Sequence, residues 1–110
     1  MKFLEEKHKQ EFFNLTPYVF YLASYFSWYC NDHFLIDPTV TSIHRPDRSS
    51  VHAWGKGIDF RSRDFSALQI ELLVAHFNNK FTYDIHRPTL RTLLYHDVGS
   101  GFHFHLQSMV

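Results

Sequence analysis

Two short segments of this chain carry side chains of the types that bind metal ions. In the first segment, two glycines separate His52 from Asp59. In the second, near the end of the sequence, His103 and His105 are one residue apart. Zinc accepts neutral imidazole and carboxylate ligands, and a catalytic zinc site uses few of them and keeps one position open for water. Together the two segments therefore offer one metal ion three or four ligands.

The second segment alternates apolar and polar residues. A strand over residues 102–107 would place His103, His105 and Gln107 on one face and would anchor Phe104 in the core. The two imidazoles would then lie about 6.6 Å apart along the strand. Both could bind one metal ion, or one could bind it while the other contacts the substrate. Two surface histidines on a half-exposed strand are the alternative interpretation.

The first segment has the composition of a tight turn. Gly55 and Gly57 disfavour a regular helix and permit the chain to fold back on itself. Such a turn would let the side chains of His52 and Asp59 reach one cation. The alternative is a glycine-rich hairpin in which the histidine has no function.

The rest of the sequence predicts the elements that must position these side chains. Thr16 and Pro17 are a capping residue and a first helical residue, and the helix that they begin extends to about residue 31. Its tyrosines form a wide aromatic surface, which indicates packing on a sheet, with stacking on a ligand as the alternative. Ser66 and Gln69 form a possible capping box for a second helix ending near residue 79. Extended segments or strands are predicted at residues 34–36, 39–43, 58–60, 81–86, 92–96 and 102–107.

This order of elements predicts the fold class and the domain organisation. We expect an α+β protein in which an antiparallel sheet packs against two main helices. A chain of 110 residues is long enough for one modest core. We therefore expect a charged lead-in over residues 1–14 and one small domain over residues 15–110.

Composition argues against several classes of function. The chain has 11 basic and 11 acidic residues, so its charge does not favour nucleic acid as a partner. The uncharged run from Phe12 to Asn31 contains Asn14 and Pro17, which makes stable membrane insertion unfavourable. The N-terminal sequence lacks the features of a secretory signal. Cys30 is the one cysteine and is expected to be a small buried hydrophobe.

The first metal-binding segment resembles a known signature. Residues 50–59 read S-x-H-x-x-G-x-G-x-D, which is similar to the S-x-H-x-x-G-x-A-x-D signature of the zinc D-alanyl-D-alanine peptidases. That family includes VanX- and VanY-like carboxypeptidases and phage L-alanyl-D-glutamate endolysins, and its fold is related to the Hedgehog signalling domain. The resemblance covers roughly residues 15–110 and implies a Hedgehog-like fold.

The resemblance also implies roles for individual residues. It assigns zinc binding to His52, Asp59 and His105, and substrate binding to Arg45 and Ser50. Arg45 follows the predicted strand 39–43, where the family has an arginine that holds the substrate; a solvated loop charge is the alternative interpretation. Phe102 stands where the family often has the acidic general base. Either Asp97 or His103 takes the base role, or the site has lost catalytic power.

The residues and the resemblance together predict a zinc metallopeptidase that hydrolyses peptidoglycan stem peptides. The small size resembles that of phage or prophage lysis enzymes, which would be made in the host cytoplasm and act at the cell wall or in the periplasm. The main alternative is a catalytically degenerate zinc domain that binds peptides or protein partners. A cupin-type metal enzyme also uses a His-x-His pair, but two substantial helices leave too little of the chain for its strands.

Overall fold

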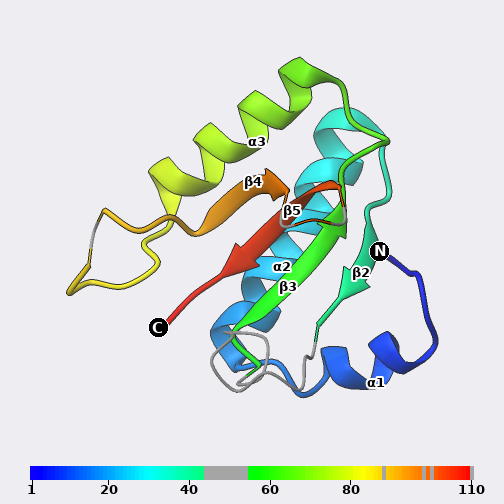
Figure 1. The fold of residues 1–110 in the computed structure, drawn as a ribbon, viewed down its shortest axis with the longest axis horizontal. Helices are drawn as coiled ribbons and strands as arrows, with labels where there is room; N and C mark the ends of the chain where they lie inside the picture. The colour runs from blue at the N-terminus through cyan, green and yellow to red at the C-terminus, as the bar shows by residue number, and fades with distance from the viewer. Residues whose placement is uncertain (44–54, 88, 98, 100, 110) are drawn as a thin grey trace.

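The computed structural model describes residues 1–43, 55–87, 89–97, 99 and 101–109 (Figure 1). Along the chain, a short strand is followed by two helices and a π-helical segment, then by two strands, a third helix and two final strands. The elements are β1 (Lys2–Phe3), α1 (Lys7–Phe12), α2 (Pro17–Tyr29), η1 (Cys30–Phe34), β2 (Thr39–Ser42), β3 (Gly57–Arg61), α3 (Ala67–Lys80), β4 (Leu93–Asp97) and β5 (Phe102–Gln107).

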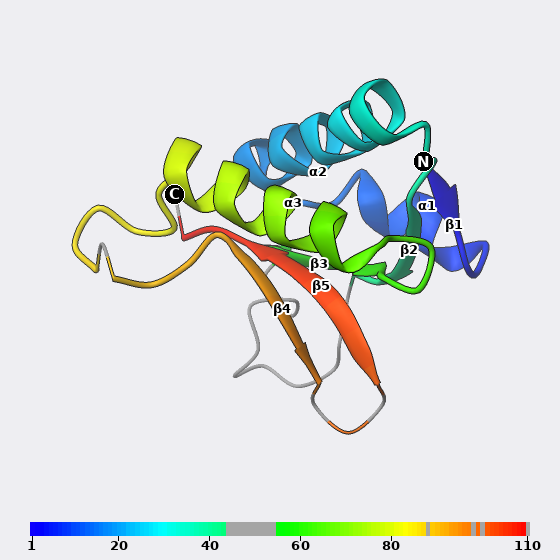
Figure 2. The same cartoon turned by 90° about the horizontal axis from the view of Figure 1, so that it is seen from above.

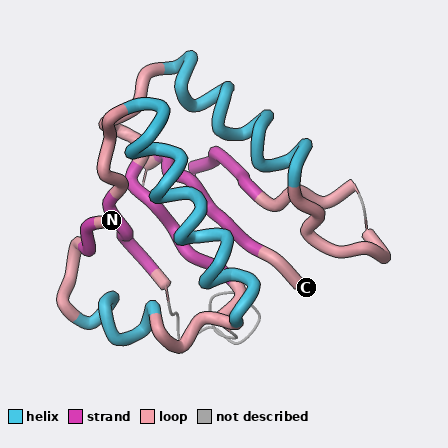
Figure 3. Tube along the Cα trace, turned by 180° about the vertical axis from the view of Figure 1, so that it is seen from behind, coloured by secondary structure: helices cyan, strands magenta, loops and turns pink. Residues whose placement is uncertain are grey.

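The strands form one five-stranded sheet in the order β1-β2-β3-β5-β4. The pair β1–β2 is parallel and the other three pairs are antiparallel. Helices α2 and α3 lie on the same side of this sheet, as Figures 2 and 3 show from two directions. The predicted α+β class is confirmed. The parallel edge strand was not predicted, because β1 has two residues and lies in the segment taken as a lead-in.

Both main helices begin where the sequence predicted. Helix α2 starts at Pro17, but the Thr16 hydroxyl makes no capping hydrogen bond; instead the Thr16 backbone N–H donates to the carbonyl oxygen of Gly55 at 2.9 Å. Helix α3 starts after a complete capping box, in which the Ser66 hydroxyl accepts from the Gln69 backbone N–H. The capping box satisfies two backbone donors that a helix start would otherwise leave without partners.

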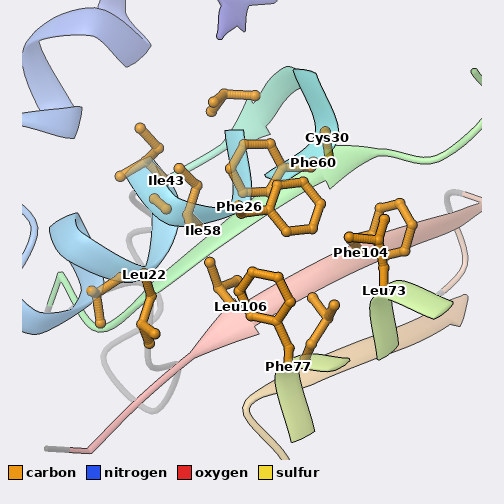
Figure 4. Close-up of a cluster of buried hydrophobic side chains, with 14 of the residues drawn as sticks. Leu22, Phe26, Cys30, Ile43, Ile58, Phe60, Leu73, Phe77, Phe104 and Leu106 are labelled. Atoms are coloured by element: carbon orange, nitrogen blue, oxygen red, sulfur yellow. The ribbon is translucent and has the colours of Figure 1, made fainter. Parts of the chain in front are cut away.

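The apolar stripe of α2 packs on the sheet. Phe26 stacks on Phe60 of β3 with ring centroids 4.3 Å apart and meets Phe104 of β5 edge-on at 5.5 Å (Figure 4). All three rings are fully buried. Alternate residues of β3 and β5 are therefore anchored in the core, and the residues between them face the opposite side of the sheet.

The tyrosine stripe of α2 packs differently from the prediction. Tyr25 and Tyr29 lie against His76 of α3, with ring centroids 5.8 and 4.5 Å away, and not on the sheet. The Tyr25 hydroxyl is 2.8 Å from Nε2 of His76. This surface therefore joins the two helices, and a ligand is not needed to explain it. Cys30 is fully buried, and burial raises the pKa of its thiol to about 12, as expected for a hydrophobic role.

Two predicted extended segments are wrong. At residues 34–36, Phe34 is the last residue of the π-helix η1, and Leu35, its C-cap, adopts a left-handed conformation with φ 56°. Residues 81–86 contain no strand; Asp84 there accepts the His86 backbone N–H and pairs with the Arg87 guanidinium at 2.8 Å, which closes a turn. No helix in the described ranges combines the length and the apolar character that a membrane crossing requires.

Candidate metal centre

The register of the central strands gathers polar side chains on the face of the sheet away from α2 and α3. Asp59 of β3 pairs with His105 of β5, and Arg61 pairs with His103. On the other side of β5, His96 of β4 also pairs with His103. Directly paired residues of antiparallel strands point to the same face, with Cβ atoms about 4.5–5.5 Å apart. The predicted alternation along residues 102–107 is thus confirmed at its histidines.

Asp59 and His105 form the centre of this cluster. Oδ1 of Asp59 lies 2.7 Å from Nδ1 of His105, although the two residues are 46 positions apart. Only 2% of Asp59 and 8% of His105 are exposed. Burying a carboxylate is costly unless a charged or hydrogen-bonding partner compensates it, and His105 is such a partner. The structure therefore brings together two of the three predicted zinc ligands.

Gln107 determines which nitrogen of His105 faces Asp59. The side-chain Nε2 of Gln107 donates to the backbone carbonyl oxygen of Arg91 at 3.0 Å, so its Oε1 is the atom that faces His105. Nε2 of His105, 2.9 Å from that oxygen, must carry a proton and donate it. This bond orients the ring so that Nδ1 faces Oδ1 of Asp59, and these two atoms are close enough to share a proton. Hydrogen bonds of this kind usually orient metal-binding histidines.

The unprotonated ring nitrogen of His103 faces the Asp59 carboxylate. Its Nδ1 lies 3.2 Å from the carbonyl oxygen of Gly101, which can only accept, so Nδ1 carries the proton of the neutral ring. Its Nε2 is buried, has no hydrogen-bond partner in the described parts of the chain, and lies 3.6 Å from Oδ2 of Asp59. A buried nitrogen without a partner beside a carboxylate fits a bound cation or a proton donor.

Asp97 shapes the turn that holds His103. Its Oδ1 accepts the backbone N–H groups of Gly99 and Gly101 at 2.8 and 3.0 Å. These hydrogen bonds, above all that from Gly99, hold the pKa of the Asp97 carboxyl below its usual value. Both glycines have positive φ, 108° and 101°, which other residues rarely adopt. The turn then aims the Gly101 carbonyl at the His103 ring.

Three further residues on this face of the sheet were not among the site residues predicted from the sequence. Gln107 orients His105, His96 lies with its ring 5.0 Å from His103 and 5.6 Å from His105, and Arg61 lines a pocket of about 250 Å³ together with Asp59 and His103. Strand alternation placed Gln107 on the correct face. Alternation along β3 also places Arg61 on the face of Asp59. The pairing of Arg61 and His96 with His103, however, depends on strand register, for which the sequence carries no comparable signal.

Phe102 lies on the predicted face of β5, the same face as Phe104, because the rings of both residues contact Tyr95. It is not buried there, however: 59% of the residue is exposed. Its ring stacks on Tyr95 of β4 with centroids 5.0 Å apart. The position at which the zinc D-alanyl-D-alanine peptidases often have an acid is therefore occupied here by one ring of an aromatic pair.

The other predicted site residues, His52, Arg45 and Ser50, lie outside the described residues. Within the described ranges, no three His, Cys, Asp or Glu side chains form a group able to hold a metal ion. Where the described chain resumes, Gly55 has φ 68°, and a Cβ atom there would lie 2.7 Å from the backbone oxygen of Asn14. Position 55 therefore requires a glycine.

Comparison of the chain with protein-family models, with curated proteins and with solved structures found no match. The function is therefore inferred from the side chains of Asp59, His103, His105 and their neighbours.

Proposed function

We propose that the protein is a zinc metallopeptidase that hydrolyses peptide bonds in peptidoglycan stem peptides. The observation that carries the proposal is the buried Asp59–His105 pair. Beside it, at the wall of a pocket, lies Nε2 of His103, which has no hydrogen-bond partner among the described residues. Asp59, His105 and His52 would hold the metal. We further propose the Hedgehog-like fold of the D-alanyl-D-alanine peptidases and a phage or prophage role in cell-wall lysis, both suggested by the S-x-H-x-x-G-x-G-x-D segment.

Zinc held at this site would supply a Lewis acid for the peptide carbonyl and would bring the pKa of a water molecule to about 7. The chain supplies the proton transfers. Nε2 of His103 bears the lone pair because Nδ1 donates to Gly101, so it can accept the proton of the attacking water. The same nitrogen then returns that proton to the leaving amine nitrogen. Asp97 contributes by fixing the turn that orients His103, and His103 is the better candidate of the two for the base role.

Metal analysis of the purified protein, coupled to a turbidity assay on isolated cell walls, tests this proposal. We expect one zinc ion per chain and a fall in turbidity that a chelator abolishes and added zinc restores. Asp59→Asn and His105→Ala should lose zinc and activity together. Glu71→Gln is a matched control, because Glu71 is an exposed carboxylate on α3. Wild-type protein that neither holds zinc nor clears cell walls would contradict the proposal.

A second function is a zinc domain that binds peptides without cleaving them. The stacked Phe102–Tyr95 pair and the two hydrogen bonds that the Asp97 carboxylate accepts in its turn favour it, because neither position then offers an acidic general base. Bound zinc with intact cell walls after prolonged incubation would support this second function.

A further inference from the structure

A second pocket lies between the N-terminal segment and α2, away from the candidate metal centre. Its volume is about 440 Å³, within the range of small-molecule binding pockets. None of the residues that line it belongs to the proposed zinc site, so it has no part in the proposed peptidase function. The pocket is lined mainly by Phe3 of β1, Lys9 and Phe12 of α1, the adjoining Phe13, and Ser24 and Ser27 of α2.

Aromatic rings give this pocket an apolar wall. The Phe12 ring contacts those of Phe3 and Phe20, with centroids 5.8 and 4.7 Å away, and the Phe13 ring lies 5.9 Å from it. Phe12 is buried, but 76% of Phe13 is exposed. Part of the wall is therefore apolar surface in contact with water, and an apolar ligand would remove that surface from water.

Two small residues of α2 leave the space that the pocket occupies. Ser24 and Ser27 are three positions apart in the helix and so lie next to each other on its surface. The Ser24 hydroxyl donates to the backbone carbonyl oxygen of Phe20 at 2.9 Å, so it is already engaged within the helix. Ser24 is exposed while Ser27 is buried. A larger side chain at position 24 would therefore fill the pocket without disturbing the core.

Lys9 places a positive charge at the pocket. Its Nζ lies 3.6 Å from Oε2 of Glu6, and the two side chains are 57% and 84% exposed. Ion pairs this exposed contribute little free energy, so a ligand carboxylate can replace Glu6 at small cost. Aromatic rings alone would also suit a cationic ligand. The ammonium group of Lys9 repels a cation, and the charge of the pocket therefore favours an anion.

Shape and charge also favour a small ligand over a bilayer or a second copy of the chain. The buried Phe12 and Ser27 line a concave pocket, which admits a narrow chain and not a flat protein surface. Residues 1–14 contain three lysines and three glutamates, so this segment has no excess of basic side chains to attract anionic lipids.

We propose that this pocket binds a single-chain alkyl carboxylate of the fatty-acid type. The alkyl chain lies against the phenylalanine rings and the carboxylate lies at Lys9. Each methylene group that leaves water strengthens binding by up to about fourfold until the pocket is filled. Binding needs neither zinc nor the side chains of the candidate metal centre.

NMR titration of the full chain with octanoate and octylammonium tests the inference, because these probes share one alkyl chain and differ in charge. The wild type should bind octanoate about fivefold more tightly at low ionic strength, the upper range for an exposed ion pair. Resonances of Phe12, Phe13 and Ser24 should shift. Lys9→Glu should reverse the preference. Lys7→Glu is the matched control and should keep it, because Lys7 lies on the same helix, is 66% exposed and does not line the pocket.

A second variant tests the position of the alkyl chain independently of charge. Ser24→Leu should weaken octanoate binding about tenfold or more, because the new side chain occupies the space of several methylene groups. Absence of saturable octanoate binding to the wild type, an unchanged preference in Lys9→Glu, or undiminished binding to Ser24→Leu would overturn the inference. Dimerisation or sedimentation with phosphatidylglycerol vesicles, in protein that does not bind octanoate, would also overturn it and assign this face to a second copy or a bilayer.

Discussion

Replacing Gln107 by leucine tests whether the orientation of His105 matters for metal binding. The change removes the acceptor 2.9 Å from Nε2 of His105 and the donor to the Arg91 carbonyl oxygen. Because the His105 side chain is only 10% exposed, water cannot fully replace the lost acceptor. A buried donor left without a partner costs about 1–3 kcal/mol in the free energy of unfolding. Loss of such an orienting bond costs about 10- to 100-fold in metal affinity.

The assay is zinc competition with a chelating dye of known affinity, accompanied by urea denaturation. Gln107→Glu is the matched control, since a carboxylate keeps the acceptor for His105 but loses the donor to Arg91. It should keep zinc affinity within about tenfold of the wild type and lose about 1 kcal/mol of stability. Undiminished zinc affinity of Gln107→Leu would refute the reasoning, and equal losses in both variants would assign the effect to the Arg91 contact.

Three further predictions follow from the site and the core. His103→Ala should keep zinc bound and lower hydrolysis about 10²-fold or more; zinc loss measured in that variant would make His103 a ligand and support the non-catalytic function. Phe26→Ala should lower the free energy of unfolding by about 3–5 kcal/mol in urea, because Phe26 fills the space between Phe60 and Phe104; a loss below about 1 kcal/mol would contradict this packing. Burial, and then Lys80 and His33, lower the pKa of His76. As the pH falls, the His76 side chain is therefore protonated more readily in the unfolded chain than in the folded protein. The free energy of unfolding should then fall as the pH drops below about 6.5. His76→Phe should reduce that loss of stability, as measured by denaturation curves at pH 5 and pH 7.5.

Helices α2 and α3 and strand β5 were predictable because their sequence signals are local. Pro17 and the Ser66–Gln69 capping box lie within a turn of the helix starts that they determine. The alternation along β5 sends His103 and His105 to one face whatever the partner strand is. By contrast, β1 has two residues, too few to carry a period, and Leu35 is an ordinary residue in a left-handed conformation. Neither could be predicted from residue type.

The sequence by itself determined which residue types the site can use, since His105 and Asp59 stand in two segments with ligand chemistry. Tertiary structure decided how they meet: the β3–β5 register places Asp59 opposite His105, and a slip of one residue would have turned Asp59 into the core. It also decided that Gln107 orients His105 and that Arg61 shares a pocket with His103. Strand pairing joins segments that are distant in the sequence. This register is stabilised by the packing of Phe60 and its neighbours against α2. No pattern confined to one segment encodes it.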